Sequence, residues 1–248
     1  MVITIVIEAN LKEDEENFQL LTGQCGLIDL FMSCADYPTG KIHERIVGGK
    51  IARIGEFPWQ VKIVHKKSGG LICGGSLLCE KFVLTAAHCV TYPQTADPSD
   101  PRDVDLILGD HQTNKTDPGE VIHEVKRWIV HPLYSPVPNF SNDIAIIELK
   151  KPAKINKFVN TACLPYMEPN DDSTVIISGW GLLKDIQDFG RISTVLQKAE
   201  INIISRKQCK DMYSKPSPYG VTGEINENMI CAASKGKDSC QGDSGGNV

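Results

Sequence analysis

The sequence has no apolar run near the length of about 20 residues that a membrane-spanning helix needs. It also lacks a secretory signal peptide, because residues 1–7 have no basic flank and meet Glu8 before an apolar core is complete. A strong charge of either sign is missing too. The net charge is −5, and residues 1–45 hold three basic and eight acidic side chains, which leaves 23 of each sign in the rest. We therefore expect neither a membrane nor a nucleic acid as a partner.

Cysteine, by contrast, is plentiful, with nine residues in a chain of 248. So many cysteines indicate folding in an oxidising compartment. Glycosylation sequons at Asn114 and Asn139 agree with this, since both lie in loop-like stretches near prolines, although such triplets also occur by chance. We predict an extracellular, secreted glycoprotein, and we expect its natural precursor to begin upstream of Met1, where a signal peptide would lie.

The chain divides into two parts by composition. Residues 1–45 read as a leader, because no core is visible in them and the acidic run at residues 13–16 is typical of a solvated segment. Residues 46–248 are long enough to form a compact domain of roughly 200 residues. The predicted organisation is therefore a leader at 1–45 and a folded domain at 46–248.

Beyond residue 59, short β-rich runs alternate with turn residues, which is typical of all-β barrels. The predicted strands cover residues 60–65, 75–78, 82–85, 104–108, 121–130 and 143–149, then 175–181 with a terminal Gly-Trp-Gly turn, 196–204 and 229–233. Residues 205–213 have the apolar spacing of a short helix. Residues 92–101 are rich in proline and aspartate, so they predict a surface loop.

Three short motifs contain residue types that suit nucleophilic catalysis. Ser244 lies in a Gly-Asp-Ser-Gly-Gly stretch, His88 ends one apolar run and Asp143 opens another. A serine hydroxyl is a poor nucleophile at neutral pH, so it needs a neighbouring base and N–H donors for the oxyanion. Singly, these residues could be a half-buried histidine, a turn carboxylate and a serine in a glycine turn. Their order along the chain, His then Asp then Ser, is that of the chymotrypsin class of catalytic triad.

On these motifs the sequence resembles the trypsin-type, chymotrypsin-like serine peptidases across residues 46–248. The resemblance implies an all-β fold of two antiparallel six-stranded Greek-key β-barrels. It implies His88, Asp143 and Ser244 as the catalytic triad, protein or peptide substrates, and no cofactor. The long loop at 92–101 is similar to that of complement-type peptidases, the mannan-binding-lectin-associated group, where it would restrict access to the cleft; a tolerated insertion is the alternative.

The same resemblance assigns an oxyanion hole and a specificity pocket. The backbone N–H groups of Gly242 and Ser244 would bind the oxyanion. Asp238, six residues before Ser244, would form the base of a pocket that prefers Arg or Lys in the substrate, because a buried carboxylate left unpaired is costly. The alternative for Asp238 is an ordinary acidic turn residue.

Arg45 and Ile46 resemble the activation site of the family. Cleavage after Arg45 would free the α-amino group of Ile46, which would pair with Asp243 and order the oxyanion turn. The protein would then be a zymogen with an activating protease, and protein inhibitors would be further partners. An ordinary arginine before a β-strand is the alternative.

The resemblance also implies a set of disulfides, one of which ties the leader to the domain. The expected pairs are Cys73 with Cys89, Cys209 with Cys231, and Cys163 with either Cys25 or Cys34. Cys240 would pair with a cysteine beyond residue 248, and Cys79 would either join the spare leader cysteine or stay free.

Three carboxylates, Asp110, Asp117 and Glu120, lie where some relatives hold Ca²⁺ with oxygen ligands. Gln112 and Lys115 interrupt the set. We favour a solvated acidic loop over a calcium site, and we predict no metal.

The family continues past the serine motif with the rest of the second barrel and a terminal helix, whereas this sequence stops at Val248. We expect the second barrel to be incomplete in this chain, and we expect the chain to residue 248 to lack peptidase activity by itself. Two functional hypotheses remain open. The natural protein is a secreted trypsin-like zymogen, or it is an inactive homologue that acts only as a binding or decoy protein.

Overall fold

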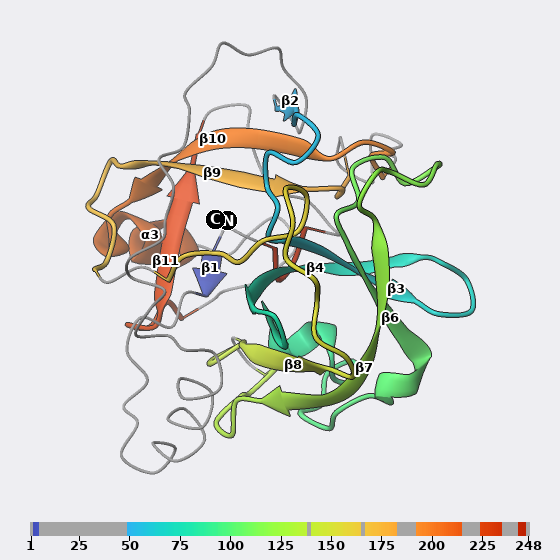
Figure 1. Ribbon diagram of the computed structural model, residues 1–248. Helices are drawn as coiled ribbons and strands as arrows, with labels where there is room; N and C mark the ends of the chain where they lie inside the picture. The colour runs from blue at the N-terminus through green and yellow to red at the C-terminus, as the bar shows by residue number, and fades with distance from the viewer. Residues whose placement is uncertain are drawn as a thin grey trace.

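A computed structural model of the chain describes residues 2–4, 49–137, 140–164, 167–182, 192–214, 224–234 and 243–246 (Figure 1). Strands dominate these residues. They are β1 Val2–Thr4, β2 Lys50–Ile51, β3 Gln60–His65, β4 Leu71–Cys79, β5 Phe82–Thr85, β6 Val104–Leu108, β7 Val121–Val130, β8 Ala145–Leu149, β9 Thr174–Gly179, β10 Gln197–Ile204 and β11 Met229–Ala233. The helical segments are η1 Ala87–Cys89, η2 Pro101–Asp103 and α3 Arg206–Tyr213. The prediction of an all-β fold is confirmed.

Six strands close into an antiparallel barrel in the order β3-β4-β5-β8-β7-β6. Every second residue of a strand points into the barrel, and the residues at these positions are mostly apolar, so the interior is apolar. Val61 and Ile63 of β3 lie opposite Leu108 and Leu106 of β6, and none of these four side chains is more than 1% exposed. The predicted closed barrel is therefore confirmed, and its core fixes the strand ends that carry His88 and Asp143.

The outward face of β3 is buried as well, although its residues are polar. Gln60 and Lys62 are 3% and 6% exposed. The second sheet covers this face, since the Ser178 hydroxyl of β9 donates a hydrogen bond to Gln60 Oε1 at 2.8 Å. β3 thus belongs to the barrel core on one side and to the contact between the two sheets on the other.

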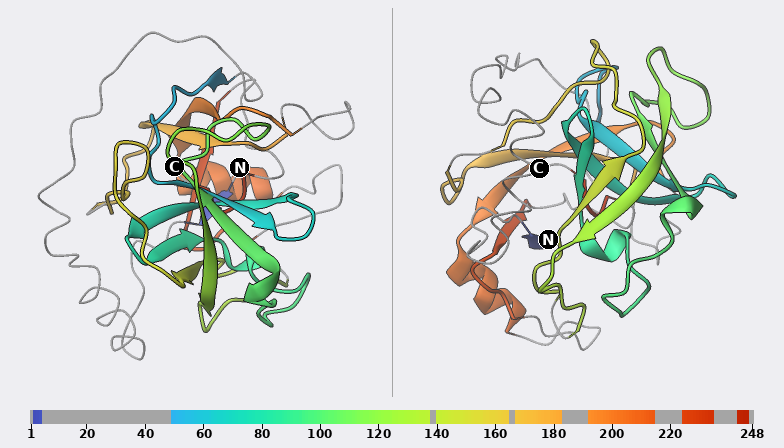
Figure 2. Two further views of the ribbon diagram at one scale, coloured as in Figure 1. Left: turned by 45° about the vertical axis from the view of Figure 1, so that its right-hand side comes forward. Right: turned by 60° about the horizontal axis from the view of Figure 1, so that its bottom comes forward.

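The second sheet has five strands in the order β1-β11-β10-β2, with β9 also paired to β10. Figure 2 shows this sheet beside the first barrel, with α3 on the side away from it. β9 and β10 pair antiparallel from Thr174 opposite Asn202 to Gly179 opposite Gln197. Over the described residues these five strands do not close into a barrel.

One strand of this sheet comes from the predicted leader. The backbone of β1 pairs antiparallel with β11, so that Val2 lies opposite Cys231 and Thr4 opposite Met229. A free sheet edge offers unpaired N–H and C=O groups, which an added strand satisfies. The leader therefore contributes a short strand that its composition did not predict.

The predicted short helix is confirmed as α3. Its N-cap, Ser205, forms a capping box with Gln208: the Ser205 hydroxyl accepts from the Gln208 N–H, and the Gln208 side chain accepts from the Ser205 N–H. Cys209 on the buried side of α3 forms a disulfide with Cys231 of β11. Among the described helices, none is long and apolar enough to cross a membrane.

Candidate active site

His88 and Asp143 meet because their strands pair. His88 lies in η1 just after β5, Asp143 lies just before β8, and β5 and β8 are neighbours with Thr85 opposite Ala145. The carboxylate of Asp143 makes two contacts with His88. Its Oδ2 lies 2.7 Å from Nδ1 of the imidazole, and its Oδ1 accepts the backbone N–H of His88 at 2.9 Å. The pairing of two strands thus fixes both the position and the orientation of the imidazole.

The side chains of His88 and Asp143 differ in their exposure to solvent. The side chain of Asp143 is 11% exposed, whereas that of His88 is 35% exposed. Burial and, next, the negative charge of Asp143 raise the pKa of Tyr134, although a hydrogen bond with Thr91 acts in the opposite direction. Asp143 is therefore largely shielded from water, whereas about a third of the His88 side chain is exposed.

The backbone before Asp143 is held from both sheets. Asn142 adopts a left-handed conformation with φ of 54°, which asparagine tolerates better than most residues. Its side-chain amide donates to the Leu133 carbonyl at 2.9 Å. Its side-chain oxygen accepts from Asn228 Nδ2 at 3.2 Å, and Asn228 lies next to β11. Asn142 and Asn228 thus brace Asp143, and no sequence signal singled out Asn228.

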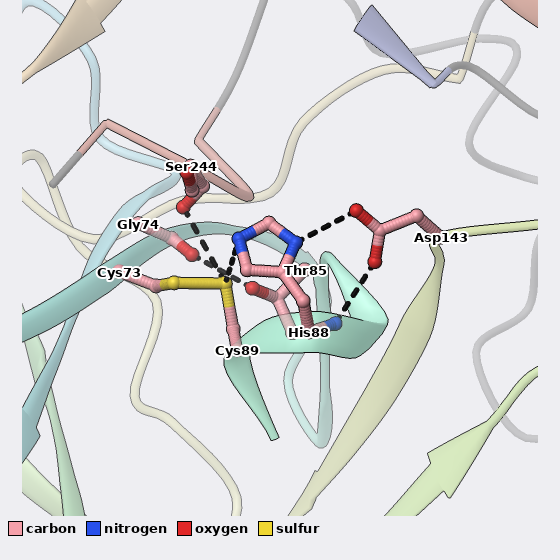
Figure 3. Close-up of a disulfide and its surroundings, with 7 residues drawn as sticks. All are labelled: Cys73, Gly74, Thr85, His88, Cys89, Asp143 and Ser244. Carbon is pink, nitrogen blue, oxygen red and sulfur yellow. Dashed lines mark hydrogen bonds and ion pairs between the residues drawn. A yellow bond between two sulfur atoms is a disulfide. The ribbon is translucent and has the colours of Figure 1, made fainter. Parts of the chain in front are cut away.

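The predicted nucleophile lies on the other side of the imidazole. Figure 3 shows the His88 ring between Asp143 on one side and Cys89 and Ser244 on the other. The sulfur of Cys89 lies 3.7 Å from His88 Nε2 and 3.8 Å from the Ser244 carbonyl oxygen. That carbonyl accepts the N–H of Gly74 in β4 at 2.8 Å. Within the described residues, no hydrogen bond joins the Ser244 hydroxyl to His88, so the three residues are assembled without that contact.

The turn that carries Ser244 depends on a glycine. Gly245 has φ of +74°, and a Cβ there would lie 2.8 Å from the Gly74 carbonyl oxygen and 2.9 Å from the Ala86 nitrogen. Both the conformation and the space therefore require glycine. This glycine lets the turn 243–246 lie directly against β4 and the end of β5.

Asp243 links the turn to the second sheet. Its Oδ1 accepts the N–H of Gly181 at 2.7 Å, just beyond β9. A Cβ at Gly179 or at Gly181 would overlap the Asp243 carboxylate. The Gly-Trp-Gly turn expected at the end of this strand therefore leaves the space in which the Asp243 carboxylate lies.

Two disulfides lie wholly within the described residues. One joins Cys73 of β4 to Cys89 of η1, and so it ties the segment of His88 to the strand beneath Ser244; the other joins Cys209 to Cys231. Cys79 and Cys163 are disulfide-bonded as well. The alternative that Cys79 stays free is therefore wrong.

The carboxylate loop differs from the solvated acidic loop that we favoured. Asp110 and Asp117 are 7% and 3% exposed, and carboxylate oxygens of these two residues and of Glu120 lie within 4.8 Å of one another. Protein donors reach one oxygen of each aspartate: Lys62 pairs with Asp110 Oδ2, and Asp117 Oδ2 accepts the N–H groups of His111 and Gln112 at 2.9 and 2.5 Å. The Oδ1 atoms of Asp110 and Asp117 are buried without a hydrogen-bond partner. The solvated interpretation is therefore wrong for Asp110 and Asp117, which are buried, whereas Glu120 is half-buried.

Of the remaining predicted site residues, the structure describes only Asn114. Asn114 is exposed in a turn, where glycosylation stays a prediction. Eight residues named from the sequence lie outside the described residues. They are Cys25, Cys34, Arg45, Ile46, Asn139, Asp238, Cys240 and Gly242.

The fold and the site define a class of protein, the chymotrypsin-like serine peptidases. In a comparison with models of known families, residues 46–248 match the family described as Trypsin. The chain therefore belongs to the trypsin family.

Several known proteins are similar to the chain. Mannan-binding lectin serine protease 1 of Mus musculus is 37% identical over 214 residues, which are 82% of this chain and 29% of that protein. The venom peptide isomerase heavy chain of Agelenopsis aperta is 36% identical over 205 residues, which are 81% of this chain and 81% of that protein. Trypsin V-A of Rattus norvegicus is 35% identical over 227 residues, 90% of this chain and 82% of that protein. The resemblance to the lectin-associated group is thus confirmed at the level of sequence, while the chain spans less than a third of that relative.

Proposed function

We propose that the protein is a secreted serine endopeptidase of trypsin-like specificity, made as a zymogen with a leader at residues 1–45 and a peptidase domain from residue 46. The observation that carries the proposal is the two-point contact between Asp143 and His88, at 2.7 and 2.9 Å, beside the turn of Ser244. Membership of the trypsin family supports it, as do the disulfides, which suit an oxidising compartment.

The proposed mechanism follows from which nitrogen of His88 is free. Because Nδ1–H donates to Asp143, Nε2 is unprotonated and takes the proton of the Ser244 hydroxyl as its oxygen attacks the carbonyl carbon of the substrate. His88 then returns the proton to the leaving amine, while Asp143 stabilises the imidazolium. Water completes the hydrolysis of the acyl-enzyme by the same route. The N–H groups of Gly242 and Ser244 stabilise the oxyanion, an effect of about 3 to 4 kcal/mol per donor.

Activation is the second part of the proposal. Cleavage after Arg45 frees the α-ammonium of Ile46, which pairs with Asp243. The contact of Asp243 with Gly181 supports this role, since it already ties the residue next to Ser244 to the second sheet. The implied partners are an activating protease, protein inhibitors and substrates cut after Arg or Lys, with Asp238 at the base of the pocket.

This function is tested by measuring the hydrolysis of matched Arg, Lys and Phe amides before and after treatment with trypsin. The protein used here and in the tests below is the full-length natural protein, not residues 1–248 by themselves. Cleavage should switch on hydrolysis of the Arg and Lys amides, and Arg45→Gln should abolish the switch. Asp238→Ser should remove most of the preference for basic residues, because an unpaired buried charge costs about 3 to 5 kcal/mol. Equal activity before and after cleavage would refute activation, and a preference for Phe would refute the pocket. Absence of any hydrolysis that depends on Ser244 would favour the binding or decoy homologue.

A further inference from the structure

The contact between the two sheets holds a buried ion pair that the mechanism above does not use. Lys62 of β3 pairs through Nζ with Asp110 Oδ2, and the two side chains are 8% and 1% exposed. We infer that Lys62 and Asp110 are positioning residues, which fix the turn 243–246 by holding the indole of Trp180. The effect of the pair on catalysis rests on the proposed peptidase function, whereas its effect on the position of the turn does not.

The first link runs from the ion pair to Trp180. The ammonium of Lys62 lies 5.5 Å from the centre of the indole ring, and Trp180 is 1% exposed. A cation over an aromatic face is attracted to it, and more strongly where water is excluded. The indole N–H donates to the carbonyl of His111, the neighbour of Asp110, at 3.2 Å. The first barrel thus holds Trp180 at its face through Lys62 and at its edge through His111.

The second link runs from Trp180 to the residue before the predicted nucleophile. Gly179 and Gly181 flank Trp180 and form the surface on which the Asp243 carboxylate lies. The Gly181 N–H donates to Asp243 Oδ1 at 2.7 Å. A shift of the Trp180 backbone therefore moves Asp243, and Ser244 with it.

A third link places Lys62 on the face of β3 and β4 that the turn covers. In the β3–β4 pair Lys62 lies opposite Gly74, and opposite residues of an antiparallel pair share one face. The Gly74 N–H donates to the Ser244 carbonyl at 2.8 Å, and a Cβ at Gly74 would lie 2.9 Å from the Gly246 Cα. Lys62 therefore lies on the face that the turn 243–246 covers, while its ammonium lies over the ring of Trp180.

Among the described residues, Lys62 is the one buried cation beside the carboxylates of Asp110, Asp117 and Glu120. Burial lowers the pKa of the neighbouring His111, despite the attraction of Asp117 and Asp110, so this imidazole is neutral at neutral pH. Lys115, which lies 3.8 Å from Asp117, is 54% exposed. Removing one member of a buried pair leaves an uncompensated charge, whereas replacing both members with apolar residues often preserves stability. The double replacement therefore separates the stability of the fold from the position of the turn.

The test compares four forms of the full-length protein: wild type, Lys62→Met, the double variant Lys62→Met with Asp110→Leu, and Lys66→Met. Lys66 is the matched control, because it also makes ion pairs from the end of β3 but is 42% exposed. Hydrogen–deuterium exchange is followed in peptides that cover residues 179–182 and 243–246, together with the melting temperature. Hydrolysis of an Arg amide is measured on the same samples after cleavage at Arg45.

We expect Lys62→Met to lower the melting temperature and to speed exchange at residues 179–182 and 243–246 at least about tenfold. The double variant should recover most of the melting temperature but keep the fast exchange, with kcat reduced about 10- to 100-fold and KM little changed. Lys66→Met should match the wild type. If Lys62→Met does not fold, the double variant decides alone.

Wild-type exchange in the double variant, at residues 179–182 or at residues 243–246, would overturn the inference, because packing alone would then position that segment. Wild-type exchange in Lys62→Met would overturn it as well. A wild-type protein without hydrolysis that depends on Ser244 would refute the proposed function instead, and the exchange rates would still decide the inference.

Discussion

In the proposed mechanism, the chemistry at His88 depends on which of its two ring nitrogens carries the proton. The carboxylate of Asp143 faces Nδ1 at 2.7 Å and also accepts the backbone N–H of the same residue, so the ring neither rotates nor changes tautomer freely. The hydrogen-bond acceptor at Nε2 is thereby directed toward the side on which Ser244 lies. A neutral amide at position 143 would have nearly the same shape but would lose this preference.

We predict that Asp143→Asn lowers kcat about 10⁴-fold with little change in KM, the loss typical of this change in a chymotrypsin-class triad. The measurement is steady-state hydrolysis of an Arg amide by the cleaved full-length protein. Asp97→Asn, at an exposed residue of the loop after His88, is the control and should leave kcat unchanged. A kcat of Asp143→Asn within tenfold of the wild type would contradict the role of Asp143.

At the scale of elements, an irregularity in β7 brings two cations to one carboxylate. The register between β7 and β8 shifts between Val125 and Arg127. Neighbouring residues of a regular strand point to opposite faces, but an irregularity of this kind lets both reach the same group. Lys126 Nζ and Arg127 Nε each donate to Glu148 of β8 at 2.6 Å. The pairing of β7 with β8, which also positions Asp143, is therefore reinforced at its outer surface.

Glu148 gives this element a pH dependence. Burial alone would raise the pKa of Glu148, but the hydrogen bonds from Lys126 and Arg127 outweigh burial and hold this pKa below its usual range. The folded-state pKa is lower than that of the unfolded chain, about 4.3, so the ionised carboxylate stabilises the fold above about pH 4.3. This contribution is lost as the pH falls through the folded-state pKa.

We predict that Glu148→Gln lowers the free energy of unfolding by about 1 to 2 kcal/mol at pH 7, a range that allows for the exposure of both cations. The difference from the wild type should shrink as the pH falls below about 4. Urea denaturation at pH 7 and at acidic pH, with the disulfides intact, measures it. Glu124→Gln is the matched control, because Glu124 also bridges two lysines but is 53% exposed. A difference that persists unchanged in acid would show that shape, rather than charge, accounts for the effect.

Across the whole molecule, the sequence predicted elements better than it predicted the contact between them. The predicted bounds 60–65 match β3, and the predicted 205–213 differ from α3, Arg206–Tyr213, only by its N-cap Ser205. Both follow from alternation and spacing, which are local properties. The burial of Lys62 is different, because an alternating strand looks the same whether its polar face meets water or another sheet. The burial of Asp110 was misjudged for the same reason, since its partner Lys62 lies 48 residues away in sequence.

In the candidate site, too, residues in local motifs were predicted from the sequence, whereas residues brought there by packing were not. His88, Asp143 and Ser244 stand out because each lies in a short motif with an unusual local composition. Asn228, which donates to Asn142 beside Asp143, lies in no such motif and reaches the site only through the packing of β11 near β8. Gly179 and Gly181, against which the Asp243 carboxylate lies, are visible in the sequence as a Gly-Trp-Gly motif. Only the structure shows why glycine is needed there, because a side chain would overlap that carboxylate.

The most direct measurement is covalent labelling of Ser244 by a fluorophosphonate, which reacts with a serine only when a neighbouring base activates it. The full-length protein is cleaved with trypsin, freed of trypsin and titrated with the probe, beside Ser244→Ala and His88→Ala. We predict stoichiometric labelling of the cleaved wild type and none of either variant. Labelling that persists in Ser244→Ala or in His88→Ala, or a cleaved wild type that stays unlabelled, would contradict the assignment of Ser244 as a nucleophile activated by His88.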